Sequence, residues 1–158
     1  MINKKSTIAT GFTIIEVTVV LLIISIVFIA ALPVTGKAAS SFNLRHTANQ
    51  MAADIREVQQ RALSESSSLY MINFYPNKYE IKKSSHPTAA IIDAVHLPQG
   101  IRIEHINFSE DQVRFSTEGT PRVGGTVTIR DQKTDKFMFV IIASITGRVR
   151  VSDKPPKD

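Results

Sequence analysis

The chain of 158 residues contains no cysteine, so it can form no disulfide and has no thiolate chemistry. It also lacks a glycine-rich phosphate loop and a nucleophile elbow. No spacing typical of metal ligands is present, because the histidines are scattered without a paired ligand: His46, His86, His96 and His105. We therefore expect no enzyme, no bound metal and no cofactor.

A strong excess of one charge is missing as well. The formal net charge is +5, but Lys4 and Lys5 contribute two of the positive charges near the start. From Leu69 onward, 13 lysines and arginines face 10 aspartates and glutamates, a net of +3. This is far from the dense basic patches of strong nucleic-acid binders. The adjacent carboxylates Glu110 and Asp111 are expected in a solvent-exposed turn, so their proximity does not indicate a catalytic pair.

What the sequence does have is one long apolar run. From Phe12 to Leu32 there are 21 residues with a single charge, Glu16. About 20 apolar residues cross a bilayer as a helix. An ionised carboxylate at the bilayer centre costs roughly 2.5–3.5 kcal/mol even on lenient insertion scales. Any interpretation of this run must therefore explain why it contains Glu16.

Two general interpretations leave that question open. A cleaved secretory signal would use Lys4 and Lys5 as its basic end and Ala30–Ala31 as its cut site. Its apolar part, however, should span about 7–15 residues and carry no carboxylate. A plain signal anchor would hold the lysines inside by the positive-inside rule, but it explains neither Gly11 nor Glu16.

A third interpretation accounts for both residues. The stretch Gly11-Phe12-Thr13-Ile14-Ile15-Glu16, preceded by a short basic leader, resembles the class III signal of type IV pilins and pseudopilins. The resemblance implies that a prepilin peptidase removes residues 1–11 by cutting between Gly11 and Phe12. The same enzyme would then methylate the new amine of Phe12, and Glu16 would become the fifth residue of the mature chain.

Elementary electrostatics gives Glu16 a role in assembly. Cleavage creates an α-amine with a reference pKa of about 7.7–8 at the positive end of a helix dipole, which is an unfavourable place for it. A carboxylate one turn away, or on a neighbouring subunit, can neutralise this charge, and the pairing is stronger in a low dielectric. Glu16 of an incoming subunit is therefore expected to pair with the Phe12 amine of the preceding one.

The sequence predicts four segments. Residues 1–11 are the leader and residues 12–33 a transmembrane helix, which Pro33 ends or kinks. Residues 34–66 continue it as an amphipathic helix, because Met51, Ile55, Val58 and Ala62 follow a 3.6-residue period. We favour one kinked helix over two unrelated ones. Serine-rich residues 64–68 mark the exit into a head at residues 67–158.

The head is expected to be β-rich. Alternating or apolar runs predict seven strands, at residues 69–75, 78–81, 101–104, 112–116, 126–130, 137–143 and 148–151. Pro76-Asn77 fits a hairpin turn, and residues 84–90 and 116–125 read as loops. Residues 137–143 are apolar on both faces and predict a central strand. The fold class is therefore α+β, with a long N-terminal helix packed on a small antiparallel sheet.

The head also resembles one branch of the pilin family. Residues 113–121, the run Gly124-Gly125-Thr126-Val127-Thr128-Ile129 and the run Gly147-Arg148-Val149-Arg150 are similar to the GspH/FimT group. These are minor pilins and pseudopilins of type IV pili, type II secretion and Gram-positive competence machinery. Some DNA-binding members carry Gly-Arg-x-Arg near the C-terminus. Arg148 and Arg150 would lie about 7 Å apart on one strand face, close to a phosphate spacing, although two solvated arginines at a sheet edge are the simpler interpretation.

The expected protein is thus a structural subunit of a short filament. It would span the cytoplasmic membrane once, with Lys4 and Lys5 inside and the head outside, before it joins the filament. Its partners would be the prepilin peptidase and other pilins, contacted through the N-terminal helix. The alternatives are a DNA-receptor pilin that uses Arg148 and Arg150, and an anchored domain with an unrelated ligand.

Overall fold

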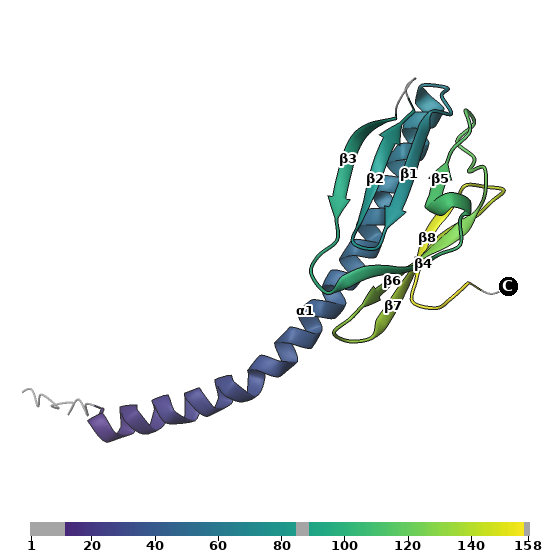
Figure 1. Ribbon diagram of the computed structural model, residues 1–158. Helices are drawn as coiled ribbons and strands as arrows, with labels where there is room; N and C mark the ends of the chain where they lie inside the picture. Colours follow the sequence, from purple (N-terminus) through teal and green to yellow (C-terminus); the bar gives the residue numbers. More distant parts are fainter. Residues whose placement is uncertain (1–11, 85–88, 157–158) are drawn as a thin grey trace, which may run out of the picture. The chain divides into compact units, whose positions relative to one another are not determined.

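A computed structural model describes residues 12–84 and 89–156, without the side chains of residues 30–38 and 109 (Figure 1). The chain divides into two compact units, Met1–Gly36 and Lys37–Asp158. One helix, α1 (Ile14–Ser64), runs from the first unit into the second. It is helical through Pro33, so this residue does not end it. The predicted kink at Pro33 stays a prediction.

Within the described residues, the second unit adds eight strands to the helix. In chain order they are β1 (Tyr70–Tyr75), β2 (Lys78–Lys83), β3 (Ala90–His96), β4 (Ile101–Ile106), β5 (Gln112–Arg114), β6 (Gly125–Asp131), β7 (Lys136–Ile142) and β8 (Val149–Ser152). A short 3-10 segment, η1 (Ser109–Asp111), precedes β5. This is the α+β architecture that the sequence predicts.

The strands form two antiparallel sheets rather than the single small sheet that was expected. Sheet A has the order β3-β2-β1-β5, and sheet B has the order β4-β6-β7-β8 (Figure 1). The predicted hairpin is confirmed, since β1 pairs with β2 from Tyr70↔Lys83 to Tyr75↔Lys78. The predicted central strand is also confirmed in its pairing, because β7 lies between β6 and β8.

One strand was not expected. β3 forms the edge of sheet A, and nearly all its side chains are exposed. Ile91 and Ile92 are both exposed, and the pairing of β3 with β2 shifts register at Ile92, so the alternation that marks a half-buried strand is interrupted here. The strand therefore carries no burial pattern from which the sequence could have predicted it.

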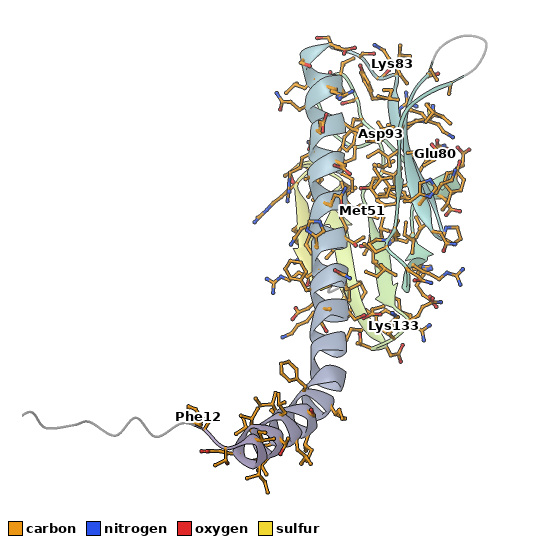
Figure 2. The ribbon with its side chains drawn as sticks, turned by 90° about the vertical axis from the view of Figure 1, so that its left-hand side faces the viewer. Phe12, Met51, Glu80, Lys83, Asp93 and Lys133 are labelled. Atoms are coloured by element: carbon orange, nitrogen blue, oxygen red, sulfur yellow. The ribbon has the colours of Figure 1, made fainter. Side chains whose placement is uncertain are left out.

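The predicted apolar stripe of α1 supplies one wall of the core. Met51, Ile55, Val58 and Ala62 are fully buried, and Figure 2 shows Met51 on the side of the helix that faces the strands. They join Ile72 and Phe74 of sheet A and the inner residues of sheet B in a single apolar cluster. At about 25 cal/mol per Å² of buried apolar surface, this cluster is the main source of stability of the second unit.

Polar contacts fix the register between helix and strands. The buried Tyr79 hydroxyl of β2 donates a hydrogen bond to the Asp54 carboxylate of α1. Burial raises the pKa of the Asp54 carboxyl, and the negative charges of Glu57 and Asp93 raise it further, against the lowering effect of this hydrogen bond. On the other side, Arg56 Nη2 donates to the carbonyl oxygen of Val149 at 2.9 Å.

Candidate functional site

The first candidate site is the start of α1. Phe12 lies just before the helix with 83% of its surface exposed (Figure 2). The Thr13 hydroxyl accepts a hydrogen bond from the backbone N–H of Glu16 at 3.2 Å, which satisfies one of the free donors of the first turn. Gly11, on the other side of the predicted cut, lies outside the described residues.

Glu16 is set among apolar side chains. Its carboxylate is solvent-exposed and borders a shallow hollow of about 300 Å³, whose other walls are Phe12, Val17, Val20 and Leu21. Within residues 12–84 and 89–156, no cation lies within ion-pair distance of this carboxylate. Glu16 is therefore available to a positive charge from outside the described chain.

The residues that follow are apolar and exposed. Large apolar side chains from Ile14 to Ile29 have between 44% and 86% of their surface in contact with solvent. Such a contiguous patch marks a surface that contacts another protein or a membrane. Among the described residues, no helix is long and apolar enough to cross a membrane.

The second candidate site is the C-terminal edge of sheet B. Arg150 lies on β8, and Arg148 directly precedes this strand. Both side chains are exposed, whereas Val149 between them points into the core. The two arginines thus share the side of the strand away from the core. Neither forms an ion pair with another described residue.

The glycine of this motif has a structural role of its own. Gly147 adopts a left-handed φ of +64°, and a Cβ at this position would lie 2.5 Å from Nε2 of Gln59 and 3.0 Å from the Gly119 carbonyl oxygen. The same Gln59 Nε2 donates a hydrogen bond to that oxygen at 2.6 Å. Gly147 therefore lets the β7–β8 turn approach both the helix and the 116–124 loop.

Other residues singled out in the sequence are not brought together. Glu110 and Asp111 lie in η1, both with left-handed backbone conformations. His46, His96 and His105 belong to α1, β3 and β4 respectively, and His86 lies outside the described residues. In the part of the chain that the structure describes, no group of three histidine or acidic side chains could hold a metal ion.

A helix with an exposed apolar start and a single carboxylate, followed by a β-rich head, is the arrangement expected of a minor pilin or pseudopilin. The chain is 26% identical over 152 residues to Competence protein ComGD of Bacillus subtilis (strain 168). The match covers 96% of this chain and 99% of ComGD, so it includes both the helix and the head. The similarity supports the resemblance to minor pilins and pseudopilins, which is confirmed.

No family model matches the chain, and no solved structure matches it. The similarity to ComGD therefore stands beside the fold and the sequence resemblance at residues 11–16 as the support for this assignment.

Proposed function

We propose that the protein is a minor pseudopilin, a structural rather than a catalytic subunit that joins a short filament of competence machinery at the membrane. The observation that carries the proposal is the exposed apolar start of α1 with Glu16 as its one charge. A surface of this kind is costly in water and becomes favourable when like helices bury it in a filament core. The whole-length similarity to a competence protein favours this machine over a secretion or pilus system.

Processing comes first in this proposal. The prepilin peptidase cuts between Gly11 and Phe12 and methylates the Phe12 amine. Phe12 is exposed and lies ahead of the first residue of α1, so a cut on its amino side would leave the helix intact. The 21-residue run from Phe12 to Leu32 then holds the subunit in the cytoplasmic membrane, as a single pass with the head outside, until assembly.

Glu16 is the assembly residue of the proposal. Its carboxylate pairs with the Phe12 amine of the neighbouring subunit, which removes two unpaired charges from an apolar environment. Breaking such a pair by removing one partner is strongly destabilising, because the other charge stays buried without compensation. The ion pair thus stabilises only the register of two neighbouring helices in which the Glu16 carboxylate meets the Phe12 amine.

The test uses the native host with and without its peptidase. Mass spectrometry should find a chain shortened by residues 1–11 and methylated at Phe12, and only in the strain with the peptidase. The Glu16→Ala variant should be cut and inserted normally but be nearly absent from isolated filaments. Glu57→Ala, which removes an exposed carboxylate from a later part of α1, is the matched control and should assemble. A full-length, unmethylated protein in the wild type, or normal assembly of Glu16→Ala, would contradict the proposal.

A second candidate function is the binding of nucleic acid by the head. The supporting observation is the pair Arg148 and Arg150, exposed on one side of an edge strand without carboxylate partners among the described residues. Phosphate contacts make binding fall steeply with salt. The Arg148→Ala/Arg150→Ala double variant should therefore bind DNA more weakly than wild type at low salt, and unchanged affinity would remove this candidate.

A further inference from the structure

The outer face of β7 is apolar but uncovered. Sheet B turns Val140 and Ile142 of this strand into the core, where both are buried. By alternation, Phe137, Phe139 and Ile141 point to the opposite side. Phe137 is 39% exposed, and the other two are half-buried. A central strand that is apolar on both faces normally has both faces covered, so this row needs another explanation.

Register places these three side chains in the middle of a definable surface, here called the outer face of sheet B. Phe137 lies opposite Arg130 of β6, and Ile141 lies opposite Arg150 of β8. One strand further, Arg102 of β4 lies opposite Arg130. The outer face of sheet B consists of Arg102, His105, Thr126, Thr128, Arg130, Phe137, Phe139, Ile141, Arg150 and Ser152, with Arg148 at its margin.

The charges on this face are arranged in an unusual way. Like charges directly opposite each other on neighbouring strands destabilise a sheet, yet Arg102 and Arg130 occupy such a pair. Arg130 is compensated by Glu104 at 3.1 Å and by Asp135 at 2.7 Å. Arg102 takes part in no ion pair among the described residues. Positive charge thus stands at two opposite corners of the face, with the apolar row between them.

One of the two aromatic rings, that of Phe137, already stacks against a planar cationic group. The Arg130 guanidinium lies over the Phe137 ring, 5.6 Å from its centroid. Phe137 and Phe139 are two residues apart on one strand, so their side chains lie about 7 Å from each other. That spacing suits two successive bases of an extended strand, each of which offers a flat face for stacking.

We propose that the outer face of sheet B binds a single-stranded nucleic acid. Bases stack on Phe137 and Phe139, and the phosphates on either side meet Arg102 at one corner and Arg148 and Arg150 at the other. The proposal rests on the second candidate function above. It adds the part of the sheet that would contact the bases of a single-stranded nucleic acid. In a duplex the base faces are stacked on one another and cannot reach these rings.

The size of the apolar row favours a nucleic acid over a protein partner. The row is one strand wide and has arginines at both ends. A stable protein interface buries about 800 Å² on each side around a fully buried apolar centre, which a row of three half-exposed side chains does not supply. Two or three bases with their phosphates match it in both width and charge.

The test uses the full chain in mild detergent and a fluorescent oligothymidylate of about twelve nucleotides, within the usual site size of single-strand binders. Wild type should bind this probe at low salt, more tightly than a duplex of equal length, and the affinity should fall with salt. The Phe137→Leu/Phe139→Leu variant keeps apolar bulk but loses the rings, and should bind about tenfold or more weakly. Phe42→Leu removes an exposed ring from α1 and is the matched control, with unchanged binding expected.

The outcomes separate the proposals from one another. If the Arg148→Ala/Arg150→Ala variant loses binding while the leucine variant does not, the arginine candidate stands and the stacking face is wrong. If no probe binds at low salt, both nucleic-acid proposals fail and the assembly proposal is untouched. If the leucine variant fails to enter filaments and wild type binds no oligonucleotide, the row is a protein contact and the proposal is overturned.

Discussion

The two parts of α1 have the same backbone conformation but opposite surroundings. Along Ile14–Ile29 the large apolar side chains are exposed, whereas Met51, Ile55, Val58 and Ala62 are buried by strands of the same chain. The later part has a one-sided apolar pattern, because its other face meets water. The earlier part is apolar all round, which indicates that it is completed by molecules outside the chain. The comparison teaches that the helix carries two different interfaces, one internal and one external.

The largest expected effect sharpens this contrast with a matched pair of substitutions. Ile55→Ala should lower the free energy of unfolding of the second unit by about 2–5 kcal/mol, since it leaves a cavity in the core. Ile23→Ala removes the same atoms from a side chain that is 54% exposed, and should leave that free energy unchanged. Denaturant unfolding of both variants in detergent measures the difference. Equal losses would show that the two parts of α1 are not distinct in this way.

The next effect concerns the joint between the later part of α1 and the β7–β8 turn. Gly147→Ala should destabilise the protein by about 1–3 kcal/mol, because the residue has a left-handed φ, and its Cβ would crowd the Gly119 carbonyl oxygen and displace the Gln59 amide that donates to it. Gly100→Ala is the control: it has a φ of +88°, but its Cβ would meet only the flexible Lys133 side chain at 3.4 Å. Thermal unfolding should show the larger loss for Gly147→Ala, and a larger loss at Gly100 would contradict the close approach.

A pH-dependent effect is expected at Asp131, whose carboxylate accepts a hydrogen bond from Ser40 near the start of the second unit. Asp131 is buried, which by itself would raise its pKa, but hydrogen bonds from the hydroxyls of Ser40 and Thr134 and from backbone N–H groups outweigh burial and lower it. Because the folded pKa lies below the unfolded value, this carboxylate stabilises the fold above about pH 4, and the contribution is lost as the pH falls through the folded pKa. Asp131→Asn should cost about 1.5–3 kcal/mol at pH 7 and less at pH 3. A pH-independent cost in unfolding measurements would contradict this.

The smallest effect is expected on the exposed side of the later part of α1. Arg61 and Glu57 form an i,i+4 ion pair at 2.6 Å with both side chains largely in solvent. Arg61→Gln should cost only about 0.3–0.5 kcal/mol, and salt should abolish the difference. A loss above about 1 kcal/mol in the same unfolding assay would show that this side is covered by another molecule.

Much of the fold could be predicted from the sequence, because local pattern and tertiary packing agree. The 3.6-residue period of Met51, Ile55 and Val58 and the Pro76-Asn77 turn each indicate the element that forms. β3 could not be predicted, since its exposed side chains follow no period. The division into two sheets depends on pairings such as β1 with β5, which join distant segments and leave no local signal.

The candidate sites were predicted unevenly for a similar reason. Glu16 was found because a charge in an apolar run is anomalous at the level of sequence. Arg148 and Arg150 were found from their spacing along one strand. The opposition of Arg102 and Arg130 across two strands was missed, because it arises only from the register of β4 with β6. The apolar pattern of residues 137–143 correctly predicted a central strand, but it gave no sign that Phe137, Phe139 and Ile141 would stay partly exposed.

The contact between Arg56 and Val149 joins residues 93 positions apart, and it has a consequence for the order of folding. Loop closure over such a separation is slow, so the last strand docks late compared with the β1–β2 hairpin. Until β8 arrives, part of the apolar side of the helix has no cover. A nascent chain that halts before Val149 would therefore be prone to aggregation and proteolysis, although most of its residues have already been made.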